Sequence, residues 1–106
     1  MKEITVQELK QLKDAKADFQ LIDVREQHEV DNCEIAGEHI PMGDVMDNLD
    51  KISKTKQVIV HCKMGGRSGA ICNALEVAGF DNVYNLKGGI IAWANEIDPS
   101  IKHLLM

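Results

Sequence analysis

An eight-residue stretch in the middle of the chain places one cysteine beside two glycines and two cations: His61-Cys62-Lys63-Met64-Gly65-Gly66-Arg67-Ser68. Cys62 follows the most apolar run of the sequence, residues 57–60, and a helix-like pattern begins soon after it. This order predicts a strand, a tight loop and a helix, with the thiol at the mouth of the loop. Backbone N–H groups and the positive end of a helix stabilise a thiolate, which is the nucleophilic form of cysteine. The stretch therefore predicts an active site built on one activated cysteine.

The rest of this stretch favours an anionic substrate. Two adjacent glycines permit the backbone conformations that turn successive N–H groups inward, and such a nest binds anions. Two side chains add positive charge, and a serine is placed to cap the following helix. We expect Cys62 to be catalytic and the substrate-binding residues to be Lys63, Met64, Gly65, Gly66, Arg67 and Ser68. The substrate would carry sulfur or phosphorus; the alternative is a glycine turn beside an inert buried cysteine.

Length, composition and charge limit the class of protein. With 106 residues, 44% of them hydrophobic and 27% charged, residues 1–106 are expected to form one globular domain. The net charge of −5 argues against non-specific binding to nucleic acid. Three cysteines are too few and too scattered for a secreted disulfide framework. We find no apolar signal region or membrane-spanning run, and therefore expect a reducing, cytoplasmic location without a membrane partner.

Apolar spacing predicts an alternation of strands and helices. Strands are expected at residues 3–4, 19–24, 38–41, 58–61 and 82–86. Helices are expected near residues 6–15 and 43–52, from the cysteine stretch to Gly79, and over 90–97, with one or two turns at 26–32. Alternation of this kind predicts a parallel sheet covered on both faces. Asp23, Arg25 and Cys62 then lie at carboxyl ends of strands, where such sheets bind ligands.

The cysteine stretch resembles the active-site loop of rhodanese-like sulfurtransferases, whose cysteine carries a persulfide. Three further segments resemble motifs of that family and occur in the same order: residues 21–26, residues 37–41 with one residue inserted, and residues 86–93. The resemblance implies a rhodanese-like α/β fold with a five-stranded parallel sheet and helices on both faces. It also implies that Asp23 and Arg25 brace neighbouring loops rather than touch the substrate. Together the four motifs cover nearly the whole chain.

The same resemblance implies a double-displacement reaction that needs no cofactor. The Cys62 thiolate would attack the outer sulfur of thiosulfate or of a protein persulfide, and a thiophilic acceptor would then remove that sulfur. Residues 42–44 and 95–100 look most like the rhodanese domain fused to adenylyltransferases, which passes sulfur to a carrier protein. Lys63 stands where many relatives have arginine, so thiosulfate is expected to be a poorer donor here.

Two other functions remain open at this point. Cysteine-dependent phosphatases of a related fold use Cys-x5-Arg, whereas four residues separate Cys62 from Arg67 here. The shorter loop predicts a narrower cradle, better matched to a sulfur atom than to phosphate. A non-catalytic rhodanese-like binding module is the second alternative, although such modules usually lack the cysteine.

The remaining candidates receive structural interpretations. Cys72 lies within a helical pattern and is expected to be a small buried residue, whereas Cys33 has no predicted role. His61 should point away from Cys62 because side chains alternate along a strand. Trp93 is expected in the core. Because the sequence has no Cys-x-x-Cys pair, we expect no metal site.

Overall fold

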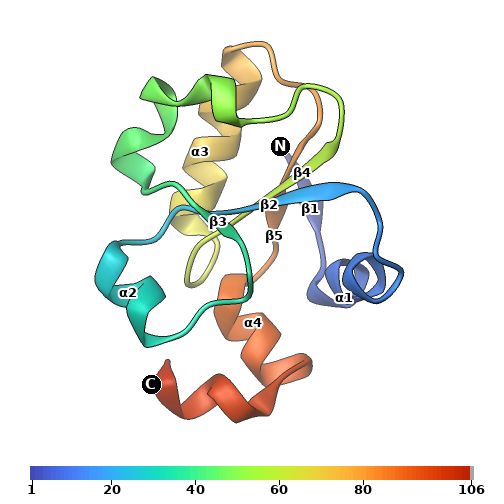
Figure 1. The fold of residues 1–106 in the computed structure, drawn as a ribbon, viewed down its shortest axis with the longest axis vertical. Helices are drawn as coiled ribbons and strands as arrows, with labels where there is room; N and C mark the ends of the chain where they lie inside the picture. Colours follow the sequence, from blue (N-terminus) through green and yellow to red (C-terminus); the bar gives the residue numbers. More distant parts are fainter. Residues whose placement is uncertain (106) are drawn as a thin grey trace.

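Five parallel strands form the sheet of the computed structural model, which describes residues 1–105. Their order is β1-β5-β4-β2-β3, so β4 lies at the centre (Figure 1). The strands are β1 (Lys2–Ile4), β2 (Phe19–Asp23), β3 (Glu38–His39), β4 (Gln57–His61) and β5 (Val83–Leu86). All strand pairs are parallel, so the carboxyl ends of β2 and β4 meet at one edge of the sheet.

Helices connect these strands. The α-helices are α1 (Val6–Asp14), α2 (Gln27–Asn32), α3 (Gly66–Val77) and α4 (Gly89–Glu96). Three 3₁₀ helices span Met42–Asp47, Leu49–Lys51 and Pro99–Leu104. The start of α1 is a capping box, in which Thr5 and Glu8 each satisfy the other's backbone N–H. None of the helices within residues 1–105 has the length and apolar character that crossing a membrane requires.

Alternate residues of the strands pack into two separate hydrophobic cores, one on each face of the sheet. In β4, Val58 and Val60 pack on the face covered by α3 and the first two 3₁₀ helices, whereas Ile59 packs on the face covered by α1 and α4. Figure 1 shows α3 on one side of the sheet and α4 on the other. Trp93 of α4 is buried in the second core, as predicted. Three consecutive apolar residues at the centre of β4 are the expected consequence of burial on both faces.

The segment predicted as one helix over 43–52 is instead two 3₁₀ helices. The break lies at Asn48, whose backbone has φ −130° and ψ 33°. Its side-chain amide donates to the Asp44 carbonyl at 2.7 Å, while its backbone N–H donates to the Val45 carbonyl at 3.0 Å. The side chain therefore takes the carbonyl that an α-helix would use for the backbone bond. Val45 and Ile52 are buried, as their spacing predicts, but the predicted type of helix is wrong.

Candidate active site

The Cys62 sulfur lies directly after β4 and is surrounded by hydrogen-bond donors. Its Sγ accepts hydrogen bonds from the Gly65 N–H at 3.1 Å, the Ser68 N–H at 3.4 Å and the Ser68 hydroxyl at 3.3 Å. Gly65 has φ +109°, a left-handed conformation that favours glycine, and this turn brings the loop over the sulfur. The loop and the start of α3 together form the cradle that the sequence predicted.

This cradle favours the ionised form of Cys62. Burial of the side chain, which is 1% exposed, would raise the pKa of the thiol. The hydrogen bonds from the Ser68 hydroxyl and from the backbone N–H groups of Ser68, Gly65 and Met64 outweigh that effect. The pKa of Cys62 is therefore lowered from the ordinary thiol value, which increases the thiolate fraction at neutral pH.

The N-terminus of α4 holds the loop from behind. The N–H groups of Ile90 and Ile91 donate to the carbonyls of Cys62 and Lys63, at 3.0 and 3.1 Å. Gly89, with φ +61°, permits this approach, because a Cβ there would lie 2.6 Å from the Cys62 carbonyl oxygen. With these carbonyls bonded to α4, the loop N–H groups of Gly65 and Ser68 can face the sulfur. Only the family resemblance singled out Gly89; its contact with the loop was not predicted.

Arg67, predicted to bind substrate, forms an ion pair with Glu29 of α2. The two guanidinium nitrogens donate to the two carboxylate oxygens at 2.7 and 2.9 Å. The Arg67 hydrogen bonds are the largest cause that lowers the pKa of Glu29 to about 2. The Glu29 carboxylate therefore balances the positive charge that Arg67 was expected to add at the mouth of the Cys62 loop. No pattern in the sequence singles out Glu29, which lies in a polar segment 38 positions from Arg67.

Ser68 and Asn85 connect the cradle to β5. The Ser68 hydroxyl lies 2.5 Å from the amide oxygen of Asn85, and the Asn85 amide nitrogen donates to the Gly65 carbonyl at 3.1 Å. Ser68 is fully buried and Asn85 is 3% exposed. Sequence reasoning missed Asn85, although a polar residue within a buried strand is a signal that could have singled it out.

Asp23 and Arg25 form a buried ion pair beside the loop. Arg25 Nε lies 3.0 Å from Asp23 Oδ1, and an Arg25 terminal nitrogen lies 2.8 Å from Asp23 Oδ2. Burial would raise the pKa of Asp23, but the hydrogen bonds from Arg25 and the nearby His61 ring lower it. Arg25 also donates to the Cys33 carbonyl at 2.8 Å, which fixes the end of α2.

The remaining cysteines and His61 lie in three different surroundings. His61 is fully buried with Nε2 3.5 Å from Asp23 Oδ2, and burial lowers the pKa of its imidazole. Cys72 is fully buried in α3, and burial raises the pKa of its thiol to about 12. Cys33 is half-buried directly after α2. Among residues 1–105, no three His, Cys, Asp or Glu side chains are grouped closely enough to hold a metal ion.

The outer part of the loop is open to solvent on one side and close to the C-terminal segment on the other. The Met64 side chain is 71% exposed. Lys63 lines a small hollow of about 70 Å³ together with Arg25, Glu29, Asn32, Leu104 and Leu105. The Asn32 amide donates to the Leu104 carbonyl, which fixes the last 3₁₀ helix beside α2.

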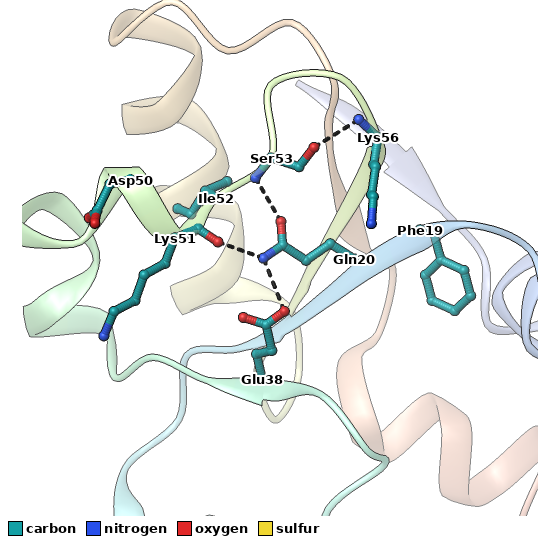
Figure 2. A pocket seen from close by; sticks show the side chains of 8 residues that line it. All are labelled: Phe19, Gln20, Glu38, Asp50, Lys51, Ile52, Ser53 and Lys56. Atoms are coloured by element: carbon teal, nitrogen blue, oxygen red, sulfur yellow. Dashed lines mark hydrogen bonds between the residues drawn. The ribbon is translucent and has the colours of Figure 1, made fainter.

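A larger hollow, of about 300 Å³, lies at the opposite, amino-terminal edge of the sheet (Figure 2). The Gln20 amide crosses it, donating to the Lys51 carbonyl at 2.7 Å and accepting from the Ser53 N–H at 2.8 Å. Figure 2 shows that these bonds tie β2 to the segment before β4. The Gln20 side chain in this hollow therefore anchors that segment.

Comparison with known proteins assigns a family to this architecture. The model of the rhodanese-like domain matches residues 5–96. "Putative sulfurtransferase YtwF" of Bacillus subtilis is 38% identical over 100 residues, which cover 93% of this chain and 96% of that protein. "Probable adenylyltransferase/sulfurtransferase MoeZ" of Mycobacterium tuberculosis is 33% identical over 101 residues, which cover 92% of this chain but 26% of that protein.

Solved structures agree with the sequence relatives. The rhodanese-like domain protein of Staphylococcus aureus superposes with a TM-score of 0.83 at 35% identity, covering 92% of this chain and 95% of that one. The predicted five-stranded parallel sheet with helices on both faces is thereby confirmed as the rhodanese-like fold. The relatives named sulfurtransferase support sulfur transfer as the general activity. On its sequence, its fold and the loop around Cys62, this chain belongs to the rhodanese-like domain family.

Proposed function

We propose that this protein transfers sulfane sulfur through a persulfide on Cys62. The Cys62 thiolate attacks the outer sulfur of a donor, either thiosulfate or another persulfide. A new S–S bond forms, the donor's S–S bond breaks, and the electron pair leaves with sulfite or with the donor thiolate. A thiolate or cyanide acceptor then attacks the terminal sulfur, and Cys62 is released as a thiolate.

The observation that carries this proposal is the set of three donors on the Cys62 sulfur. Two backbone N–H groups and one hydroxyl lie within 3.4 Å of Sγ. Such donors stabilise a thiolate before attack, and again when it leaves during discharge. In this proposal Cys62 is the catalytic residue, the residues from Lys63 to Ser68 surround the transferred sulfur, and Asp23 with Arg25 brace the loop.

The charges at the mouth favour a persulfide donor over free thiosulfate. Arg67 is paired with Glu29 at 2.7 Å, so it presents less net positive charge to a small dianion. Lys63 supplies a cation without the two-point geometry of a guanidinium. A persulfide-bearing protein carries less charge on its sulfur and can gain contacts outside the loop, where Met64 is exposed.

The likeness to an adenylyltransferase/sulfurtransferase supports a small sulfur-carrier protein as the acceptor. We propose that this transfer takes place in a reducing, cytoplasmic setting. Mass spectrometry of a carrier that has an acceptor cysteine, after incubation with the persulfidated protein, would show one added sulfur atom, because the carrier thiolate takes the terminal sulfur and Cys62 leaves as a thiolate. Transfer to small thiols alone would contradict this choice of acceptor but leave the persulfide chemistry intact.

Intact-protein mass spectrometry tests the central step. After incubation with thiosulfate or a low-molecular-weight persulfide, the protein should gain the mass of one sulfur atom, and cyanide should remove it as thiocyanate. Cys62→Ser should abolish this gain, whereas the matched variant Cys33→Ser should retain it. A mass gain that persists in Cys62→Ser would overturn the mechanism. Phosphate release from an aryl phosphate without sulfur uptake would favour the phosphatase alternative instead.

A further inference from the structure

The Ser68 hydroxyl faces two acceptors but has one proton to donate. Cys62 Sγ lies 3.3 Å from the hydroxyl oxygen on one side, and Asn85 Oδ1 lies 2.5 Å from it on the other. A serine hydroxyl donates a single hydrogen bond at a time, although its oxygen can accept others. The two contacts therefore compete for the same proton.

Asn85 is fixed so that its oxygen, and not its nitrogen, meets the hydroxyl. Its amide nitrogen donates to the Gly65 carbonyl at 3.1 Å, which leaves Oδ1 toward Ser68. A flipped amide would place two oxygens against each other at Gly65. Both Ser68 and Asn85 are buried, so water offers the hydroxyl little competition.

We propose that Asn85 is a positioning residue that controls the reactivity of Cys62 by competing with its sulfur for the Ser68 hydroxyl proton. When Cys62 is a thiolate, the hydroxyl turns toward sulfur and the Asn85 oxygen loses its donor. When the sulfur is a neutral thiol or is bonded to a second sulfur, the hydroxyl turns back toward Asn85. The hydroxyl keeps its proton in both positions, and only its direction changes.

Through Ser68, Asn85 changes the free energy of the Cys62 thiolate relative to the Cys62 persulfide. This effect on the persulfide rests on the proposed function. Competition from Asn85 raises the free energy of the thiolate relative to the persulfide, whose Sγ no longer carries the charge. Loading of Cys62 with sulfur is thereby favoured, and premature return to the thiolate is opposed. Asn85 touches neither the sulfur nor a substrate in this role; it acts through Ser68.

The charged groups near the Cys62 thiol do not depend on Asn85. The ionisable groups whose charges couple to Cys62 are Arg67 and Cys72, both on α3. Glu29 of α2 faces Arg67 and stays ionised above acidic pH. None of the three contacts Asn85 through a hydrogen bond found in residues 1–105, so substitution of Asn85 leaves these charges unchanged.

The pH dependence of Cys62 alkylation, followed by peptide mass spectrometry, tests the proposal. In Asn85→Ala the midpoint should move to lower pH, and the thiolate fraction at pH 6 should rise about threefold, because the hydroxyl has lost its other acceptor. Ser68→Ala should move the midpoint to higher pH. In the double variant, Asn85→Ala should add nothing to the effect of Ser68→Ala.

A merely structural role for Asn85 predicts the opposite sign. If Asn85 only holds the loop through the Gly65 carbonyl, its loss should raise the midpoint, and should do so equally with or without the Ser68 hydroxyl. Either result would overturn the proposal. Asn85→Leu, which fills a similar volume without an amide, provides a second variant should the alanine variant fail to fold. Because alkylation requires no sulfur donor, this test can fail while persulfide transfer stands.

Discussion

Arg67 and Glu29 face each other in a two-point ion pair across the mouth of the Cys62 loop, with N–O distances of 2.7 and 2.9 Å. Arg67 lies in the first turn of α3 and Glu29 lies in α2, so the pair joins these two helices. Glu29 thus governs how much positive charge the loop presents to a donor.

Substitution of Glu29 and substitution of Arg67 should change the rate at which thiosulfate forms the Cys62 persulfide in opposite directions. Glu29→Gln removes a negative charge from the mouth and should raise the second-order rate of persulfide formation roughly threefold to tenfold at low salt. Arg67→Ala leaves Glu29 without its partner and should lower that rate by a similar factor. Both effects should shrink in 1 M salt, where charges are screened beyond about 3 Å. Equal rates in the two variants would contradict this account.

The same pair predicts a pH effect on stability. Glu29 has a folded-state pKa of about 2, below its ordinary value of 4.5. A carboxylate with a lowered pKa stabilises the fold fully above pH 4.5, and this contribution is lost as the pH falls toward 2. Urea denaturation of the wild type and Glu29→Gln between pH 6 and pH 2 should therefore show a shallower acid loss of stability in the variant, and parallel curves would contradict the prediction.

Cys62 and Cys72 should differ sharply in reactivity. Hydrogen bonds lower the pKa of the Cys62 thiol, whereas burial raises that of Cys72 to about 12. Iodoacetamide at pH 7 should therefore modify Cys62 and leave Cys72 unmodified in the folded protein. Peptide mass spectrometry measures both sites in one experiment, with the urea-unfolded protein as the control in which they react alike. Faster labelling of Cys72 in the folded state would contradict the prediction.

Gly89→Ala should damage both stability and the active site. A methyl group there would overlap the Cys62 carbonyl oxygen at 2.6 Å, and φ +61° is strained for alanine. We expect a loss of roughly 2 kcal/mol or more in the free energy of unfolding, together with slower Cys62 alkylation. Gly43→Ala is the matched control, because no atom lies within 4 Å of a Cβ there, and it should change stability by less than about 0.5 kcal/mol.

Asp23→Asn should destabilise the protein by about 3 kcal/mol, because it leaves the Arg25 guanidinium buried without its counter-charge. Both side chains of this pair are 1% exposed. Asp18→Asn is the contrasting control, since Asp18 pairs with Lys56 at the surface and is 81% exposed. Asp18→Asn should change the free energy of unfolding by less than about 0.5 kcal/mol. Similar losses in the two variants, measured by urea denaturation, would show that burial does not decide the strength of these pairs.

Local patterns predicted most of the fold because they record which side chains must be buried. Strand β4 and helix α3 follow from apolar runs and from the two glycines at the start of the helix. The two 3₁₀ helices on either side of Asn48 could not be predicted in this way, because apolar spacing does not reveal that a side-chain amide displaces a backbone hydrogen bond.

The site was predictable only as far as one continuous stretch defines it. The donors to the Cys62 sulfur come from residues three and six positions later, within reach of sequence reasoning. Glu29 lies 38 positions from its partner Arg67, and Asn85 lies 17 positions from its partner Ser68, so only the packing of the whole sheet brings them to the loop. Their identities follow from tertiary structure rather than from spacing.

The bond from Asn32 to the Leu104 carbonyl has a practical consequence for protein engineering. Leu104 and Leu105 line the same hollow as Lys63, so a tag or fluorophore joined after residue 105 would start beside the reactive loop. The exposed residues 54 and 55, beside the hollow at the opposite edge of the sheet, are the better attachment point for surface immobilisation (Figure 2). A probe fixed there would leave the edge that holds Cys62 uncovered, whereas one joined after residue 105 would sense changes close to the loop.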